Sequence, residues 1–315
     1  MRLFVGVDGG GSKTTAAVSD ETGRVVGLAV GGPSNYNALG IDVAAECVLA
    51  AISEAVGQAV SEADDDAEIA GLCLALAGVA RPADHAAWRG AVTRWLEISG
   101  LRWSIRAEGA IITHDAMAAL VGGTGLREGV VVIAGTGAIA FGATAHGKEA
   151  RSSGWGYLLG DEGSGYWIGL QGLRAVCRAD DGRGPATTLT QHLLAARSLS
   201  TPQELVRLIY SGWKPADVAT LAPAVLDVAA GGDAVANEIV QRAAVELSDA
   251  ALAVLRSLDL FDQTTEIVTA GSLWDGPLLR DGFAAQLHTQ APQATVIESR
   301  HPPVTGALLL ARGTA

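Results

Sequence analysis

Two aspartates and two glycine-rich turns are the groups in this chain whose types and spacing could do chemistry. The first aspartate, Asp8, ends a short apolar run and is followed at once by Gly9, Gly10, Gly11, Ser12, Lys13 and Thr14. Consecutive glycines let backbone N–H groups line a concave turn, and such a turn suits a phosphate. The run is not a P-loop, because its lysine lacks the required glycine spacing and no helical pattern follows. We predict a nucleotide-phosphate hairpin here, the alternative being a flexible glycine turn without a ligand.

A second set of such groups lies near the middle of the chain. Asp115 follows the short apolar run 110–113, and the turn Gly135, Thr136, Gly137 follows the apolar run 129–134. A carboxylate at the end of a strand can act as a general base. The same aspartate could instead cap the helix expected over 116–121, and both roles remain open. The neighbouring His114 is interpreted as structural, because alternation along the strand points it to the opposite face.

Composition and charge limit the classes of protein that this chain can belong to. The 315 residues carry a formal charge of −12, which disfavours binding to nucleic acid. Three widely spaced cysteines (Cys47, Cys73 and Cys177) supply neither a disulfide framework nor a zinc cluster. No apolar run reaches the ~18 residues of a membrane span, and the N-terminus lacks the pattern of a signal peptide. We expect a soluble, cytoplasmic protein that does not bind membranes or nucleic acid.

The elements that must position these groups form a pattern that occurs twice. Three strands (4–8, 15–18 and 24–30) precede a helix that starts near Asp42, a strand over 69–76, a helix over 82–96 and a strand over 110–113. The second half opens with strands at 129–134, 139–144 and 149–153, and closes with strands at 265–269 and 295–298. Helical patterns at 161–178, 202–209, 215–229 and 234–258 lie between them, and helices at 278–287 and 303–311 follow. This order predicts an α/β protein of two ribonuclease-H-like domains, the second with a helical insertion.

Four segments resemble the N-acetylhexosamine kinase branch of the actin-like ATPase superfamily, a branch shared with benzoyl-CoA-reductase-type ATPases. They are residues 8–14, 113–116, 134–137 and the long, distinctive run 154–164, GWGYLLGDEGS. The resemblance extends over nearly the whole chain. It implies actin-like domains at 1–116 plus 301–315 and at 117–300, separated by a cleft. It also implies a kinase that uses ATP and Mg²⁺ to phosphorylate the 6-hydroxyl of an aminosugar, foremost N-acetylglucosamine, and that forms a homodimer.

The resemblance also implies a role for each matching residue. The two glycine hairpins, Gly9 to Thr14 and Gly135 to Gly137, would hold the ATP phosphates from opposite sides, and Gly271 and Ser272 would adjoin the adenosine. Asp8 would hold Mg²⁺ through water, and Asp115 would be the catalytic base beside the sugar. The sugar contacts implied by the resemblance are Asn35, Asp115, Gly154, Trp155, Gly156 and Asp161.

Two departures from the family pattern bear on the substrate. Ala138 and Ala77 stand where family members often have a serine close to the acceptor sugar. Each change removes a hydroxyl, so glucosamine and N-acetylmuramic acid remain alternatives to N-acetylglucosamine.

Three other functions fit the same fold. A kinase or repressor of the repressor/open-reading-frame/kinase group usually carries a cysteine-rich zinc motif, and its repressors begin with a DNA-binding helix-turn-helix; this sequence shows neither. An ATPase activator of 2-hydroxyacyl-CoA dehydratases would hold an iron–sulfur cluster through cysteines, and none lies between Cys73 and Cys177. A catalytically silent sugar sensor would lack the base, whereas Asp8, Asp115 and both glycine turns are present.

Overall fold

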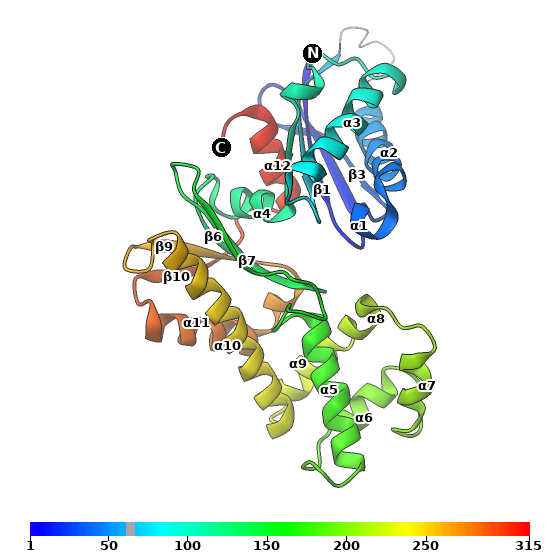
Figure 1. The fold of residues 1–315 in the computed structure, drawn as a ribbon, viewed down its shortest axis with the longest axis vertical. Helices are drawn as coiled ribbons and strands as arrows, with labels where there is room; N and C mark the ends of the chain where they lie inside the picture. Colours follow the sequence, from blue (N-terminus) through cyan, green and yellow to red (C-terminus); the bar gives the residue numbers. More distant parts are fainter. Residues whose placement is uncertain (61–66) are drawn as a thin grey trace. The chain divides into compact units, whose positions relative to one another are not determined.

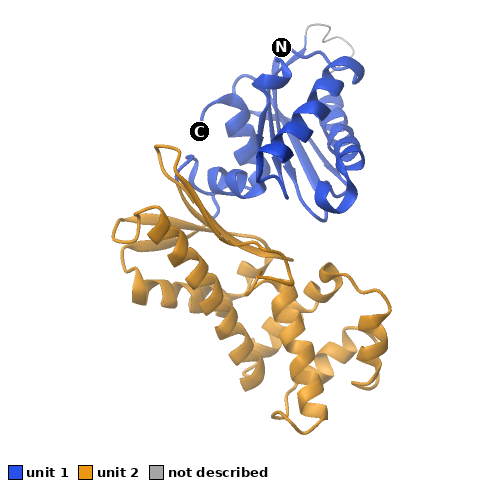
Figure 2. Ribbon diagram, viewed as in Figure 1, with its two compact units in different colours: residues 1–128, 299–315 blue, residues 129–298 orange. Residues whose placement is uncertain are grey.

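The computed structural model describes residues 1–60 and 67–315, which divide into two compact units (Figure 2). Unit 1 comprises 1–128 and 299–315, and unit 2 comprises 129–298. The boundary thus lies after the helix α4 (Asp115–Thr124), whereas the sequence suggested 116/117. The reason is packing: α4 lies against the C-terminal helix α12 (Pro303–Arg312), which belongs to unit 1.

Unit 1 is built on a five-stranded sheet (Figure 1). Its strands are β1 (Arg2–Gly9), β2 (Thr14–Ser19), β3 (Val25–Gly31), β4 (Glu68–Leu76) and β5 (Ile111–Thr113). The order is β3-β2-β1-β4-β5, in which the first three strands are antiparallel and β4 and β5 run parallel to β1. The residues that directly follow β1, β4 and β5 therefore lie at the same end of the sheet, where these parallel strands have their C-termini.

Helices cover both faces of this sheet. The helices are α1 (Tyr36–Leu39), α2 (Ile41–Ala59), α3 (Pro82–Ile98), the 3₁₀ turn η1 (Ala107–Gly109), α4 and α12. Ala16 and Val18 of β2 face the core under α2 and α3, while Ala17 between them packs against α12. At α2, Gly40 is the N-cap where Asp42 was expected, and Asp42 lies in the first turn. At the other end of α2, Val60 is the C-cap and has an extended backbone.

Glycines let α12 approach β1 and α4 very closely. A Cβ at Gly6 of β1 would lie 2.4 Å from the backbone nitrogen of Leu308, and one at Gly306 would lie 2.0 Å from the carbonyl oxygen of Ala118. Only a residue without a side chain fits at either contact. The C-terminal helix is therefore an integral layer of unit 1 and fixes β1, which ends at Asp8 and Gly9.

Unit 2 repeats the sheet of unit 1. Its strands are β6 (Gly129–Ala134), β7 (Ala138–Ala143), β8 (Glu149–Ser153), β9 (Thr265–Ala270) and β10 (Ala294–Glu298). Their order, β10-β9-β6-β7-β8, again joins an antiparallel group of three to two parallel strands. The repeat predicted from the two glycine turns is present, and so is the α/β fold class.

The helical part of unit 2 lies between β8 and β9, as expected. It consists of α5 (Gly165–Asp180), α6 (Leu189–Ala195), α7 (Glu204–Tyr210), α8 (Pro215–Ala219), α9 (Ala222–Ala230) and α10 (Ala234–Ser257). The 3₁₀ turn η2 (Ser272–Asp275) and α11 (Pro277–Gln290) follow β9. One helix was expected over 215–229, and two are found, with Thr220 and Leu221 between them. Helix α6 was not anticipated.

The structure was also searched for helices that could cross a membrane. Within residues 1–60 and 67–315, no single helix is long and apolar enough. One pair, Pro215–Ala230 with Ala234–Ser257, meets the length and composition criteria together but is bent by 117°.

Candidate functional site

The first glycine turn joins β1 to β2 in unit 1. Gly9 pairs with Thr14, and the N–H of Gly10 donates to the carbonyl of Lys13 at 2.9 Å, which closes the turn. A Cβ added at Gly11 would meet no atom within 4 Å, so the turn has an open side. Lys13 is exposed. The predicted hairpin is thus formed. It carries the cationic side chain of Lys13, and one side of its backbone is open.

Asp8 lies one residue before this turn and is electrostatically strained. Its pKa is raised to about 6, mainly by burial and also by the negative charge of Asp115, while Lys13 opposes both effects. The two aspartates lie at the C-terminal ends of β1 and β5, two strands that have β4 between them in the unit 1 sheet. Sequence predicted chemistry for both residues, and unit 1 brings their charges together.

Asp115 is the first residue of α4, and it is not the cap of that helix. His114 is the N-cap, with its Nδ1 accepting from the N–H of Met117 at 3.2 Å. Asp115 Oδ1 accepts from the N–H of Ala116 at 3.0 Å. Burial raises the pKa of Asp115, while the charge of His114 and the hydrogen bond from the N–H of Ala116 lower it. Since His114 supplies the cap, the carboxylate of Asp115 is left for another function.

The partly buried carboxylate of Asp8, on which the charge of Asp115 acts, fits a hydrated Mg²⁺. Hard divalent cations bind carboxylate oxygens and keep several waters and substrate phosphates in their coordination sphere. Asp8 and Asp115 repel each other when both are ionised, and a cation removes that repulsion. Among the described residues, no group of three or more His, Cys, Asp or Glu side chains could hold a metal by itself. The ligand phosphates would therefore have to complete the site.

The loop that contains Asn35 is attached to the first glycine turn. The hydroxyl of Thr14 donates to the carbonyl of Gly32 at 2.7 Å and lies 2.8 Å from Ser34 Oγ, and the N–H of Ser34 donates to Gly10 at 3.0 Å. Thr14 is completely buried, so its side chain holds this loop. The side chain of Thr14 therefore positions the loop, and the phosphate contact predicted for Thr14 stays a prediction.

Asn35 itself is the N-cap of α1. Its side-chain oxygen accepts from the N–H of Asn37 at 3.1 Å. A Cβ added at Gly78, just after β4, would come within 3.1 Å of that oxygen. The cap leaves the two N–H donors of the Asn35 amide for a ligand.

The second glycine turn joins β6 to β7 in unit 2, and the start of α5 supports it. The N–H of Gly135 donates to Gly137 at 2.9 Å. The N–H groups of Gly165 and Tyr166 donate to the carbonyls of Gly135 and Thr136 at 2.7 and 3.2 Å. A Cβ at Gly135 would meet nothing within 4 Å. This turn, like the first, keeps one side open.

Asp161 connects the distinctive segment 154–164 to this turn. Its carboxylate accepts from the N–H of Gly156 at 3.3 Å and from that of Ala138, and a Cβ on Gly137 would lie 2.8 Å from its Oδ2. Burial raises the pKa of Asp161, which these two bonds oppose. Asp161 has a φ of 58°, so the helix predicted from 161 begins only at Gly165.

The remaining predicted sugar residues of unit 2 form an exposed turn. Gly154 and Gly156 have φ angles of 71° and 85°, which favour glycine. Trp155 between them is 64% exposed, and the guanidinium of Arg151 lies 5.2 Å from its ring centroid. Leu158 and Leu159 are exposed as well. Apolar side chains on this turn are available to contact a ligand.

A cavity of about 520 Å³ lies in unit 2 beside the second glycine turn. Ser272 lies in the wall of this cavity. The residue before it, Gly271, has a φ of 103°, and a Cβ on Gly271 would lie 2.3 Å from the carbonyl oxygen of Ala134. The lining consists of Gly135, Thr136, Gly165, Ala216, Ala219, Thr220, Pro223, Leu226, Asp227, Ala230, Ser272, Leu273, Asp275, Gly276, Pro277 and Leu278. Most of these were not predicted, because they converge from four separate segments. A largely apolar pocket with a few carboxylates suits a nucleoside.

The buried cysteine weighs against the iron–sulfur alternative. Cys73 lies in β4 and is completely buried, and burial raises its pKa to about 12. A cluster ligand must be a thiolate. Cys73 is therefore a core residue of the unit 1 sheet.

Comparison with known proteins agrees with this arrangement. The sequence model of the BadF/BadG/BcrA/BcrD ATPase family matches residues 5–311. The chain is 32% identical to an N-acetylmuramic acid/N-acetylglucosamine kinase of Clostridium acetobutylicum, with 99% of each chain covered. It is 34% identical to an N-acetyl-D-glucosamine kinase of Dictyostelium discoideum, with 98% of this chain and 97% of the relative covered.

A solved structure shows the same fold. It is a protein of Chromobacterium violaceum that is provisionally identified as N-acetylglucosamine kinase, with 26% identity, a TM-score of 0.75 and 99% of each chain covered. The two repeated units thus form the actin-like ATPase fold that the sequence predicted.

Proposed function

The chain belongs to the BadF/BadG/BcrA/BcrD ATPase family, and we propose that it is a kinase that transfers the γ-phosphoryl group of ATP to the 6-hydroxyl of an N-acetylated hexosamine, foremost N-acetylglucosamine. The observation that carries this proposal is the pair Asp8 and Asp115, which lie at the C-terminal end of the unit 1 sheet together with an open glycine turn and the Asn35 loop.

Asp115 is the proposed catalytic base. Its raised pKa makes it a better proton acceptor than an ordinary aspartate, and the cap on α4 is already supplied by His114. As the sugar O6 attacks the γ-phosphorus, the bond from that phosphorus to the β–γ bridging oxygen breaks. The hydroxyl proton passes to Asp115, and ADP leaves.

Asp8 is the residue proposed to hold Mg²⁺, through water. When bound, the ion neutralises phosphate charge during transfer. Lys13 and the backbone of Gly9 to Ser12 would bind phosphate oxygens from unit 1, and Gly135 to Gly137 would do so from unit 2. Gly271 and Ser272, at the wall of the cavity in unit 2, would adjoin the adenosine.

The residues proposed to contact the sugar are those that the family resemblance implies. Asn35 would donate through its amide, and Asp161 would accept from ring hydroxyls. Gly154, Trp155 and Gly156 would provide backbone groups and an apolar surface. Because one relative is named for N-acetylmuramic acid as well as N-acetylglucosamine, and Ala77 and Ala138 lack hydroxyls, N-acetylmuramic acid and glucosamine stay as alternative substrates.

Two finer points follow the family resemblance. We propose that the kinase is a homodimer and that it acts in the cytoplasm, where ATP is available. Sedimentation equilibrium tests the first point, because a dimer gives twice the mass of the 32.1 kDa chain. Fractionation of native cells tests the second.

The experiment that tests the function is a coupled ADP-release assay with Mg²⁺ and five sugars: glucose, glucosamine, N-acetylglucosamine, N-acetylmannosamine and N-acetylmuramic acid. We expect sugar-dependent ADP release, with the highest kcat/KM for N-acetylglucosamine. Release at the same rate without any sugar would contradict the proposal. A brown anaerobic preparation with cluster absorbance would instead support the dehydratase-activator alternative.

A further inference from the structure

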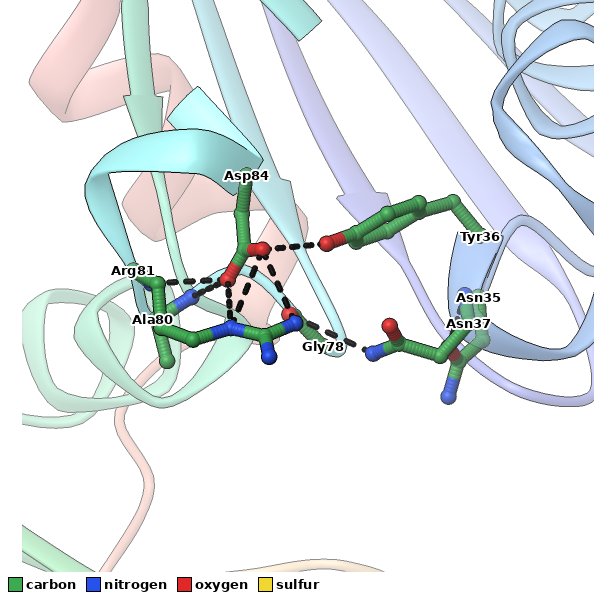
Figure 3. A network of polar contacts seen from close by, with 7 residues as sticks. All are labelled: Asn35, Tyr36, Asn37, Gly78, Ala80, Arg81 and Asp84. Atoms are coloured by element: carbon green, nitrogen blue, oxygen red, sulfur yellow. Dashed lines mark hydrogen bonds and ion pairs between the residues drawn. The ribbon is translucent and has the colours of Figure 1, made fainter. Parts of the chain in front are cut away.

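Asp84 is a buried charge outside the residues discussed so far. It lies in the first turn of α3, and its side chain is 2% exposed. The carboxylate accepts from the N–H groups of Ala80 and Arg81 at 3.0 and 2.7 Å, and from Arg81 Nε at 3.2 Å (Figure 3). Burial would raise the pKa of Asp84, but its hydrogen bonds hold that pKa well below the ordinary range. Asp84 is therefore a permanent, preorganised acceptor.

The fourth donor to this carboxylate is the hydroxyl of Tyr36, which comes from a distant part of the chain. Helix α3 holds both ends of that side chain. Asp84 binds the hydroxyl, and Trp88, one helical turn further along, packs edge-on against the ring with 6.4 Å between centroids and an interplanar angle of 83°. Trp88 is completely buried. A side chain fixed at its ring and at its tip cannot change rotamer without breaking one of these contacts.

Tyr36 directly follows Asn35, and the same segment also contacts the turn after β4. The amide of Asn37 donates to the carbonyl of Gly78 at 3.4 Å. A Cβ on Gly78 would lie 2.4 Å from Asn37 Nδ2 and 3.1 Å from Asn35 Oδ1. Figure 3 shows Asn35 and Asn37 beside Gly78, with Tyr36 extending to Asp84. The loop is thus held at Ser34 by the glycine turn and at Tyr36 by α3.

We propose that Asp84 is a positioning residue for the sugar: through Tyr36 it fixes the orientation of the Asn35 amide toward an aminosugar ring. This inference rests on the proposed kinase function. Asp84 touches neither substrate, and its effect passes through the Tyr36 hydroxyl and one backbone step. Its loss should weaken recognition of the sugar and leave phosphate binding unaltered, because the glycine turn is attached at the other end of the loop, through Thr14 and Ser34.

The test is steady-state kinetics with N-acetylglucosamine and ATP varied separately. Asp84→Asn keeps the shape but replaces one acceptor oxygen with a donor, so we expect the sugar KM to rise about tenfold, as for a lost charged hydrogen bond. Tyr36→Phe keeps the ring on Trp88 and removes only the hydroxyl, so a rise of about threefold is expected. The KM for ATP and the kcat should stay within about twofold of wild type in both variants.

Two comparisons separate positioning from a general loss of structure. Glu97→Gln makes the same charge change at an exposed position near the end of α3, so it should leave both KM values unchanged. The double variant Asp84→Asn/Tyr36→Phe should be no worse than Asp84→Asn alone, because both changes remove the same link. Equal rises in the two KM values, or multiplication of the single effects, would overturn the proposal.

The proposed function and this inference can fail separately. Thermal melting shows whether the Tyr36→Phe variant is folded. If wild type phosphorylates an aminosugar and the folded variant has an unchanged sugar KM, the inference is wrong and the function stands. If wild type releases no ADP in response to any sugar, both fall.

Discussion

The two units have the same strand order and the same glycine turn, yet the groups around the turns differ. In unit 1 the turn has Asp8 before it and Lys13 within it, and Asp115 acts on Asp8 electrostatically. In unit 2 the turn Gly135 to Gly137 contains no ionisable side chain. Its carbonyls instead accept N–H groups from the start of α5, and a cavity opens beside it.

This difference shows how one repeated element can serve two tasks. In the proposed function, unit 1 supplies the charged groups for proton transfer and metal binding. Unit 2 offers backbone donors and a largely apolar pocket, which suit a nucleotide's phosphates and its base. The repeated part is the backbone geometry of the turn, and the division of labour lies in the residues placed around it. The predictions below test this division.

The largest effect is expected at Asp115. Asp115→Asn should lower kcat at least ~100-fold, the usual contribution of a positioned base, and leave the sugar dissociation constant nearly unchanged. Because burial raises the pKa of Asp115, the wild-type kcat should fall as acid protonates it, at a pH above the ordinary range of aspartate. Near-normal turnover in the variant would remove Asp115 from the mechanism.

Asp8→Asn should reduce activity about tenfold or more at fixed Mg²⁺, with a higher Mg²⁺ concentration needed for half-maximal rate. It should also stabilise the ligand-free protein. The pKa of Asp8 is raised to about 6, so ionised Asp8 costs stability, fully above about pH 6 and not at all below the ordinary pKa of 3.8.

We therefore expect the variant to unfold at higher denaturant than wild type at pH 7.5, by at most about 2 kcal/mol given the partial exposure of Asp8. The gain should shrink as the pH falls from about 6 toward 4, and Mg²⁺ should reduce it by stabilising wild type alone. If the gain in unfolding free energy did not change with pH, ionised Asp8 would not be the group that destabilises the wild-type protein.

Asp161→Ala should raise the sugar KM about tenfold or more, because it removes an acceptor proposed for the ring hydroxyls. The matched variant is Asp161→Asn, which tolerates the φ of 58° and keeps one acceptor oxygen. Its sugar KM should be intermediate. If either variant altered only the dependence on ATP, Asp161 would belong to the nucleotide side.

The two glycine turns offer a direct comparison of smaller size. A Cβ at Gly11 or at Gly135 meets no protein atom within 4 Å, so alanine at either position should leave the fold intact. Both variants should raise the KM for ATP about three- to tenfold by crowding the phosphates. Gly57→Ala, in α2 and equally free of contacts, is the control. An effect at one turn only would mean that a single unit binds the phosphates.

Sequence predicted the repeat and both turns, because each depends on local residue types and on strand order; the roles given to Asp8 and Asp115 stay predictions. It misplaced the start of α5 by reading Asp161 as helical, since positive φ angles at Asp161 and Gly163 leave no trace in apolar spacing. It also missed the link between Tyr36 and Asp84, which joins distant segments, and most of the nucleoside cavity. Contacts of this kind arise only from tertiary packing.

The central claim, transfer to the sugar 6-hydroxyl, is tested most directly by identifying the product. Wild type, ATP, Mg²⁺ and N-acetylglucosamine would be incubated to completion and examined by ³¹P–¹H correlation NMR. The proposed function predicts a phosphomonoester signal coupled to the two protons on C6. Phosphate on another carbon, or inorganic phosphate as the only new phosphorus species beside ADP, would contradict it.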